Sequence, residues 1–426
     1  MTKRETISVS GSDVRQRNIF IAGARAKKPL VPIDMAELAD AARKKLPLPA
    51  FAYIAGGAGN EETMLANREG FSRWRIVPRM LRDVSQRDTS IELFGKRLPS
   101  PLLFSPIGVL ELAHQEADVA VAKAAAEEGV PMIFSNQASR SMEDCADAMG
   151  NADRWFQLYW SKSDDLVRSL VKRAENCGCK AIVVTLDTML LGWRTRDLDL
   201  AYLPFLQGKG IAQYTSDPVF LKMLDEPMET SAAGPINLAA IKTLLQMTRA
   251  FPGGFLENLR SGKPRAAVQK FIQIFARPSL TWENLAFLRD ITGLPILLKG
   301  ILHQGDARRA LEYGIDGIIV SNHGGRQIDG SISSIAALPG VVDAVDGKIP
   351  VIFDSGVRGG ADIFKALALG ATGVCIGRPY VYGLALAGSA GVAEVIQNLK
   401  ADFEITMALS GCRNTSEIVR ECLVEQ

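Results

Sequence analysis

The ten residues Ser321–Gly330, SNHGGRQIDG, place an imidazole, a guanidinium and two glycines directly after an apolar run. His323 can exchange a proton near neutral pH, and Arg326 offers a planar fork that suits a carboxylate. Gly324 and Gly325 allow a sharp backbone turn that can lie against a flat ligand. The same residues could also form a polar turn whose histidine caps a helix, so the rest of the chain must decide between a catalytic site and a turn.

Eight short apolar runs have the length and β-branched content of buried strands. They are Leu102–Pro106, Pro131–Phe134, Trp155–Tyr159, Ala181–Leu186, Pro295–Leu298, Gly317–Val320, Val351–Phe353 and Gly373–Ile376. Amphipathic helical segments lie between most of them: Asp118–Glu128, Asp164–Asn176, Asp306–Tyr313 and Ala361–Leu369. Alternating strands and helices predict a parallel sheet, and eight such units close into a TIM (β/α)8 barrel. An open doubly wound sheet is the alternative, but it usually has fewer strands and a glycine-rich first turn.

In a TIM barrel the active residues lie at the carboxyl ends of the strands. Here every strand ends in residues that can bind or catalyse: Pro106, Gly108, Ser135, Gln157, Tyr159, Thr185, Asp187, Lys299, Ser321, His323, Asp354, Ser355, Gly377 and Arg378. Such a ring around one mouth favours the catalytic interpretation of His323.

The ends of the last two strands indicate a phosphate site. The sequence FDSGVRGG (Phe353–Gly360) opens a predicted helix, and IGRP (Ile376–Pro379) ends the last strand. Glycine amides, a helix N-terminus and the guanidinium groups of Arg358 and Arg378 suit a phosphorylated ligand of unspecified identity. Plain surface charge is the other interpretation of the two arginines.

Two segments stand outside the regular barrel pattern. Residues 187–294 are far more than the one helix needed between the fourth and fifth strands, and two helices are predicted there, at Leu238–Arg249 and Arg265–Phe275. A loop of this length predicts a lid over the mouth or a contact within an oligomer. Residues 1–32 are polar and basic without a helical period, so we expect an N-terminal arm, followed by the barrel domain at residues 33–426.

The composition argues against several classes of protein. Forty-nine basic and 47 acidic residues give a net charge of +2, which does not indicate a nucleic-acid-binding protein. No apolar run approaches the roughly 18 residues of a membrane span, and the first residues lack the apolar core of a secretory signal. The 6 cysteines are too sparse for a disulfide scaffold, and Cys177 and Cys179 are expected to be buried thiols rather than metal ligands. We therefore expect a cytoplasmic protein without a metal, a membrane partner or a nucleic-acid partner.

Taken together, the motifs resemble the family of FMN-dependent 2-hydroxy acid oxidases and dehydrogenases. The resemblance extends from about Ile33 to the last residue and rests on SNHGGRQ, LPILLKG around Lys299, FQLY at Phe156–Tyr159, TLDT at residues 185–188 and FDSGVRGGADIFKALALGA. Within the family, the lactate 2-monooxygenase branch is the most similar, on the basis of SPIGV, LGWRTRDLDL, YLPFLQG, YTSDPVF, IGRPYVYGLALAGS and the long insertion.

The resemblance implies roles for individual residues. His323 would take the proton of the substrate hydroxyl, and Asp187 would stabilise the resulting imidazolium. Residues that would bind the substrate are Arg194 and Arg326 at its carboxylate, and Tyr53 and Tyr159. Without the resemblance, Tyr53 in FAYIAGGAGN would be interpreted as a core residue. The residues that would contact FMN are Pro106, Ile107, Gly108, Ser135, Gln157, Thr185, Lys299, Ser321, Asp354, Ser355, Gly356, Val357, Arg358, Gly377 and Arg378.

The implied reaction is the oxidation of a small L-2-hydroxy acid, first of all L-lactate, with FMN and oxygen. If the keto acid and peroxide react before they leave, the products are acetate, carbon dioxide and water; if both escape, the chain is an oxidase. A quinone-linked dehydrogenase and a flavin-binding protein without turnover are further alternatives, and a haem-containing dehydrogenase is not expected. Gly108 matches the monooxygenase branch, and Gln137 replaces a bulkier residue of relatives, which leaves substrate size open. We expect a homotetramer or homo-octamer, in which His114 and His303 are structural.

Overall fold

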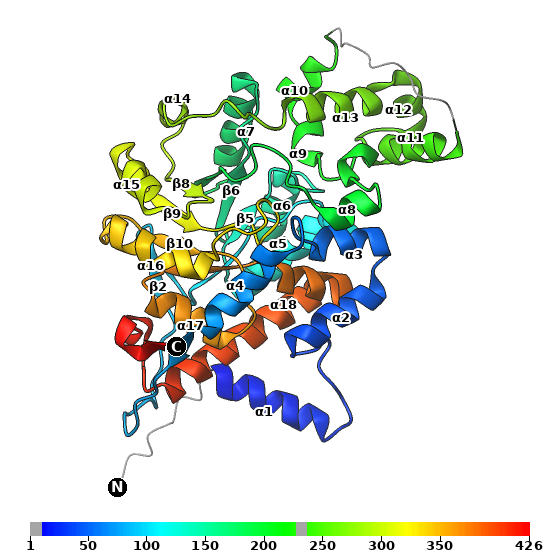
Figure 1. Cartoon of the computed structure of the whole chain (residues 1–426). Helices are drawn as coiled ribbons and strands as arrows, with labels where there is room; N and C mark the ends of the chain where they lie inside the picture. Colours follow the sequence, from blue (N-terminus) through cyan, green and yellow to red (C-terminus); the bar gives the residue numbers. More distant parts are fainter. Residues whose placement is uncertain (1–10, 227–236) are drawn as a thin grey trace.

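The chain forms a closed barrel of eight parallel strands, which confirms the predicted fold (Figure 1). The structure is a computed structural model that describes residues 11–226 and 237–426. The strands coincide with the predicted runs and are β4 (Leu102–Phe104), β5 (Met132–Phe134), β6 (Arg154–Leu158), β7 (Ile182–Thr185), β8 (Ile296–Lys299), β9 (Gly317–Val320), β10 (Val351–Phe353) and β11 (Gly373–Ile376). They pair in chain order, and β11 closes the ring on β4. The alternative of an open sheet is therefore wrong.

Helices surround the barrel, one after each strand in the order expected of this fold. They are α5 (Ala117–Glu128), α6 (Met142–Met149), α7 (Asp164–Asn176), α14 (Asn284–Ile291), α15 (Gln304–Glu312), α16 (Ser334–Val345), α17 (Gly360–Ala368) and α18 (Arg378–Leu409). Serine side chains fix the starts of two of them: Ser141 accepts from the N–H of Asp144, and Ser163 accepts from the N–H of Leu166. A short 3-10 helix, η1 (Leu110–Leu112), precedes α5.

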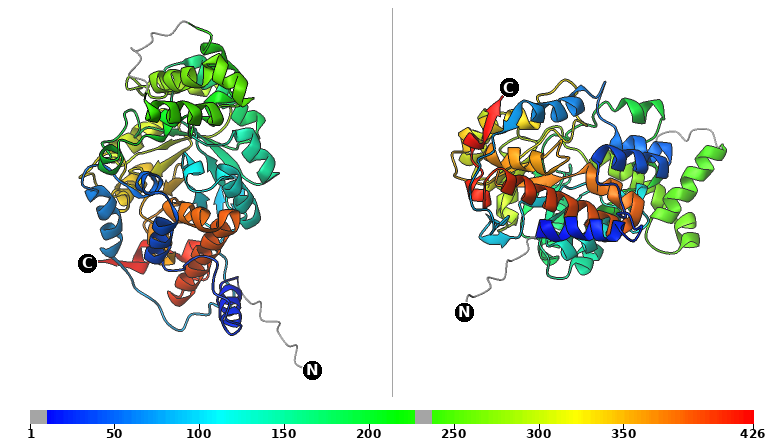
Figure 2. Two further views of the ribbon diagram at one scale, coloured as in Figure 1. Left: turned by 90° about the vertical axis from the view of Figure 1, so that its right-hand side faces the viewer. Right: turned by 90° about the horizontal axis from the view of Figure 1, so that it is seen from below.

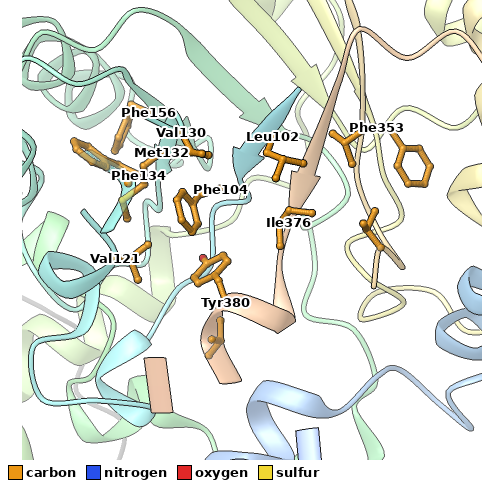
Figure 3. Close-up of a cluster of buried hydrophobic side chains, with 14 of the residues drawn as sticks. Leu102, Phe104, Val121, Val130, Met132, Phe134, Phe156, Phe353, Ile376 and Tyr380 are labelled. Carbon is orange, nitrogen blue, oxygen red and sulfur yellow. The ribbon is translucent and has the colours of Figure 1, made fainter. Parts of the chain in front are cut away.

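Successive side chains of each strand point alternately to the outside and the inside of the barrel. The outside is apolar, and the inside is apolar at one end and polar at the other. Side chains on the outer strand faces, such as Leu102, Phe104 and Phe134, pack against the helices through Val121 and Tyr380 (Figure 3). The inner faces form a separate cluster of Leu103, Ile133, Trp155, Val183, Leu297, Ile319, Ile352 and Cys375, which the hairpin β2 (Ile91–Leu93)–β3 (Lys96–Leu98) covers. Two residues further along most strands, the inner position is polar: Ser105, Ser135, Gln157, Thr185, Lys299, Ser321 and Asp354. The barrel is thus apolar at its closed end and polar at its mouth.

The last helix, α18, is the one described helix that is long and apolar enough to cross a membrane by length and composition alone. Its most apolar window is 72% buried inside the protein, and non-helical dihedral angles at Ala387 and Gly388 divide the helix in two. It packs against α1, α5 and α17, so its apolar faces belong to the core.

The N-terminal segment is more regular than the expected arm, and this expectation needs correction from residue 11 onward. Helix α1 (Gly11–Gly23) lies along α18 in both views (Figures 1 and 2). It has no amphipathic stripe for sequence patterning to detect; instead, Arg15 forms an ion pair with Glu394 at 2.7 Å and a hydrogen bond with Asn398 at 2.9 Å. Residues 1–10 of the predicted arm lie outside the described residues. The chain continues with α2 (Met35–Lys45), α3 (Leu48–Ala55), α4 (Glu62–Ser72) and β1 (Trp74–Ile76), which pairs with β12 (Leu423–Glu425) after the turns η3 (Thr415–Glu417) and η4 (Arg420–Cys422).

The insertion after β7 forms a group of helices on one side of the barrel, coloured green in Figure 2. It comprises α8 (Thr195–Asp199), η2 (Pro204–Gln207), α9 (Ala212–Thr215), α10 (Pro218–Met223), α11 (Leu238–Ala250), α12 (Phe255–Ser261) and α13 (Lys263–Ile274). The two predicted helices are confirmed as α11 and α13, whereas residues 227–236 of the insertion lie outside the described residues. Phe271 of α13 packs against Phe205 and Tyr214 of the same group, with ring centroids 5.2 and 4.9 Å apart.

Candidate active site

A buried cation and its partners occupy one side of the polar layer. Nζ of Lys299 donates to Oγ of Ser321 at 2.9 Å and lies 3.3 Å from Oδ2 of Asp354. The hydroxyls of Ser105 and Ser321 donate to the two carboxylate oxygens of Asp354. Burial opposes both charges, but Asp354 raises the pKa of Lys299, and Lys299 with the two hydroxyls lowers the pKa of Asp354. Near neutral pH, the mouth therefore holds a fixed ammonium group paired with a carboxylate.

The opposite side of the layer is a chain of neutral groups. Oγ of Ser135 donates to Oε1 of Gln157 at 3.3 Å, and Nε2 of Gln157 donates to Oγ1 of Thr185 at 3.0 Å. All three side chains are buried. Such an arrangement presents fixed hydrogen-bonding dipoles, without net charge, to whatever lies in the mouth.

His323 and Asp187 form the acid–base pair of the site. Nδ1 of His323 lies 2.9 Å from Oδ1 of Asp187, and the histidine backbone has a left-handed φ of 57°. Burial lowers the pKa of His323, as do Lys299 and Arg194, while Asp187 partly offsets the shift. Burial alone would raise the pKa of Asp187, but the imidazole lowers it overall. With Asp187 ionised, Nδ1 carries the proton, and Nε2 is left as a free base.

Four arginines line the cavity at the mouth, and within the described ranges none of them forms an ion pair with a carboxylate. Arg194 and Arg326 both approach the ring of Tyr53, with centroid distances of 5.8 and 5.0 Å. Burial, followed by the charge of Arg194, lowers the pKa of Arg326 to about 9. Burial, followed by the charge of Arg378, lowers the pKa of Arg358 to about 10. Buried cations next to like charges are stabilised by anions, so the four arginines make the cavity suited to bind anionic groups.

Arg326 and Arg378 both donate hydrogen bonds to backbone carbonyls at the C-terminal end of α3. Arg326 donates to the carbonyl of Tyr53 at 2.6 Å and to that of Gly56 at 2.8 Å. Arg378 donates to the carbonyls of Gly56 and Gly324, both at 2.9 Å. The free carbonyls at this helix end are therefore satisfied by guanidinium groups, an arrangement that the helix dipole favours.

Most of the predicted site residues meet in this cavity, whose volume including its open mouth is about 1190 Å³. Those that line it are Tyr53, Pro106, Ile107, Gly108, Tyr159, Arg194, Lys299, His323, Arg326, Asp354, Ser355, Gly356, Val357, Arg358, Gly377 and Arg378. Ser135, Gln157, Thr185 and Ser321 are buried behind the lining, and Asp187 lies behind it with a side chain that is 14% exposed. His114 and His303 lie outside the lining of the cavity, and each accepts a hydrogen bond from a backbone N–H two residues further along the chain, at Glu116 and Gly305.

Comparison with known proteins identifies the family. A sequence model of the family "FMN-dependent dehydrogenase" matches residues 42–425. The chain is 43% identical to "L-lactate oxidase" of Lysinibacillus sphaericus over 92% of this chain and 93% of that protein, and 39% identical to "2-Hydroxyacid oxidase 1" of Homo sapiens over 88% and 92%. The chain belongs to the FMN-dependent dehydrogenases.

Solved structures of the family support the same conclusion. A crystal structure of mandelate oxidase with (S)-4-hydroxymandelic acid has a TM-score of 0.76 and 35% identity, and the match covers 93% of this chain and 99% of that one. This FMN-dependent dehydrogenase is therefore a flavoprotein that oxidises 2-hydroxy acids.

The donor set of the cavity fits FMN. The phosphate of FMN is a dianion, and Arg358 and Arg378 supply two cations that the described part of the chain leaves without a carboxylate. Lys299 and Asp354 can meet the polar edge of the ring system and the ribityl hydroxyls. The motif-based prediction, in which Lys299 lies by the ring and Arg358 and Arg378 bind the phosphate, is compatible with this donor set and stays a prediction.

Some lining residues of this FMN-dependent dehydrogenase were not predicted. Three are polar, Ser105, Thr188 and Gln327, and the remainder include Leu190, Leu191, Phe205 and Phe275. The strand period could have found Ser105, because it lies two residues after the inner Leu103. Gln327 belongs to the SNHGGRQ motif but received no role. Phe205 and Phe275 come from the insertion, for which no strand register exists to predict direction.

Gly108 and Gln137 lie against each other at the edge of the cavity. A Cβ atom on Gly108 would come within 2.8 Å of the carbonyl oxygen of Gln137, so only glycine fits without a shift of the Gln137 loop.

Burial, followed by Asp187, raises the pKa of Tyr159 to about 12, so its phenol remains a hydrogen-bond donor at neutral pH.

Proposed function

We propose that this FMN-dependent dehydrogenase oxidises a small L-2-hydroxy acid, with L-lactate as the first candidate, and uses oxygen as the electron acceptor. One observation carries the proposal: a neutral His323, supported by Asp187, lies in the same cavity as Arg194 and Arg326, whose guanidinium groups form no ion pair with a carboxylate of the described residues. A 2-hydroxy acid supplies a carboxylate for the two arginines and a hydroxyl for the base. A binding protein without turnover would need no base beside its carboxylate clamp.

The residues divide the chemistry between them. Arg194 and Arg326 bind the substrate carboxylate, a geometry that suits the guanidinium fork. Nε2 of His323 accepts the proton of the substrate hydroxyl, and the charge of Asp187 stabilises the imidazolium that forms. Tyr159 stays protonated and can donate to the substrate oxygen. The chemistry that bound FMN would supply is the acceptance of the two electrons released when the Cα–H bond breaks, with oxygen as their final acceptor.

Oxidative decarboxylation to acetate, carbon dioxide and water is the outcome that we propose. It requires that the keto acid and peroxide stay together, and the insertion supplies a cover. Phe205 lines the cavity. Its ring centroid lies 6.4 Å from that of Tyr53 and 5.2 Å from that of Phe271. Phe275 adds a second aromatic wall. A closed apolar cover excludes water and lengthens the lifetime of the product complex.

Release of pyruvate and hydrogen peroxide is the second candidate, and the relative named L-lactate oxidase favours it. Its alignment covers 93% of that protein and 92% of this chain, so the two chains are of nearly equal length. The length of the insertion by itself therefore does not distinguish the two outcomes, which depend on how long the cover holds the products.

The test is aerobic turnover of the flavin-loaded enzyme with L-lactate, D-lactate, glycolate and L-mandelate, with pyruvate, peroxide and acetate measured together. Catalase is included in parallel reactions, because free peroxide also decarboxylates pyruvate in solution. Acetate that persists with catalase supports decarboxylation inside the site, whereas acetate that disappears supports release of both products. Failure of every 2-hydroxy acid to reduce the flavin would contradict the proposed function, and Arg326→Lys provides a comparison in which the fork geometry is lost.

A further inference from the structure

Gln327 connects three groups that lie on another loop of the mouth. Its side-chain nitrogen donates to the carbonyl of Asp187 at 2.6 Å and to that of Leu190 at 3.0 Å. Its side-chain oxygen accepts from Nη2 of Arg194 at 3.1 Å. The orientation of the amide is determined by these partners, since the reversed amide would place an oxygen against two carbonyl oxygens.

The two loops are also packed closely where Gln327 joins them. A Cβ atom on Gly192 would lie 2.4 Å from the carbonyl oxygen of Arg326 and 2.9 Å from Cα of Gln327. Nε of Arg194 donates to the same carbonyl of Arg326 at 3.3 Å. The backbone of residues 187–194 therefore has its position relative to residues 323–327 set by direct contact, with the amide of Gln327 as the bridging side chain.

We propose that Gln327 is the positioning residue that holds Asp187 against His323 and Arg194 toward the substrate carboxylate. The inference rests on the proposed function, because it gives Gln327 a part in both proton transfer and carboxylate binding. Only an amide offers two donors and one acceptor at this position: glutamate has no proton to donate near neutral pH, and methionine has neither group. Gln327 itself need not touch the reacting atoms.

The first experiment compares Gln327→Met in the flavin-loaded enzyme with a matched control, Gln397→Met. Gln397 lies on α18, is also half-buried and donates through its amide to Glu128. A displacement of about 1 Å in a catalytic group can cost about 100-fold in rate, so we expect kcat/KM for L-lactate to fall about 10- to 100-fold, with kcat lowered and KM raised. The control should match the unmodified enzyme. Gln327→Glu, of nearly the same size, donates nothing to Asp187 and should lower kcat as well.

The second experiment does not depend on turnover. The chain has only 3 histidines, so NMR of histidine-labelled protein can follow each imidazole, with His323→Gln identifying its signal. The charged groups that act on His323 are Asp187, Lys299 and Arg194, together with Asp354 beside Lys299. Asp187 is the first of the groups that raise the pKa of His323, so a weaker Asp187 contact should lower that pKa. We therefore expect Gln327→Met to lower the His323 pKa and to leave His114 and His303 unchanged.

The outcomes separate this inference from the proposed function. If no 2-hydroxy acid reduces the flavin, the proposed function fails, while the NMR titration still tests Gln327. If turnover is normal but the His323 titration and the kcat of both Gln327 variants equal those of the unmodified enzyme, the inference alone is overturned. Loss of FMN, or melting far below the Gln397→Met control, would make Gln327 a general structural residue and also overturn it.

Discussion

Replacement of Asp187 by asparagine tests the acid–base pair most directly, because it removes one charge and almost no volume. The nearest atoms of Asp187 and His323 are 2.9 Å apart, so the charge centres of a carboxylate and an imidazolium would be about 4 Å apart. Two unit charges at that separation interact by about 4 kcal/mol at the effective dielectric constant of about 20 that suits protein sites. If about half of this energy develops in the transition state, flavin reduction slows about 30-fold, and if all of it develops, about 1000-fold.

The pH dependence of the same variant has a defined sign. His323 must be neutral to accept a proton, so the rate rises with pH through its pKa, which burial places below the ordinary value of about 6.5. Asp187 is the main group that raises this pKa, and the asparagine variant loses its charge. The acid limb of kcat/KM should therefore move to lower pH in Asp187→Asn while the plateau falls.

The assay is anaerobic mixing of the flavin-loaded enzyme with L-lactate, followed through the flavin absorbance over a range of pH. Asp199→Asn is the control, because Asp199 is exposed on α8 in the same segment of the chain. A plateau rate in Asp187→Asn equal to that of the unmodified enzyme would refute the role of Asp187, and an acid limb that moved to higher pH would refute the electrostatic reasoning.

Three further predictions concern the cofactor, the cover and the cavity edge. Arg358→Gln removes one charge-assisted contact worth about 1.5–3 kcal/mol, so the Kd of FMN should rise about 10- to 100-fold in a fluorescence titration, while the melting temperature of the flavin-free protein does not fall. Phe205→Ala should lower the free energy of unfolding by about 3 kcal/mol and increase the share of free pyruvate and peroxide in the products, measured with catalase present and absent. Gly108→Ala forces a Cβ to within 2.8 Å of the Gln137 carbonyl, so it should lower kcat/KM and shift products from acetate toward pyruvate; unchanged kinetics would show that the Gln137 loop yields freely.

The barrel could be predicted from the sequence because each strand carries its own signal. A buried parallel strand is a short apolar run, and the strand period then fixes which of its residues reach the mouth. Lys299 and Asp354 are examples, since each lies two residues beyond an inner apolar side chain, Leu297 and Ile352. Their ion pair at 3.3 Å follows from strands that the barrel brings together around one mouth.

Other parts of the site depend on contacts that leave no period in the sequence. Helix α1 has no apolar stripe, and charged groups such as Arg15 and Glu394 hold it on α18. Phe205 reaches the cavity from a short 3-10 turn in the insertion, where neighbouring residues follow no regular direction. The roles of Gln327 and Gly192 likewise become visible only when two loops far apart in the sequence are placed together.

The hydrogen bonds of Arg378 link cofactor binding to the geometry of the substrate site. Arg378, which we expect to bind the phosphate, donates to the carbonyl of Gly324, next to His323, and to that of Gly56, three residues after Tyr53. Arg326 shares the carbonyl of Gly56, so one backbone oxygen lies between the phosphate site and the carboxylate site. An anion bound near any of the four guanidinium groups would relieve the repulsion among them. We therefore expect FMN, through its phosphate at Arg378, to stabilise the loop that carries His323 before any substrate arrives.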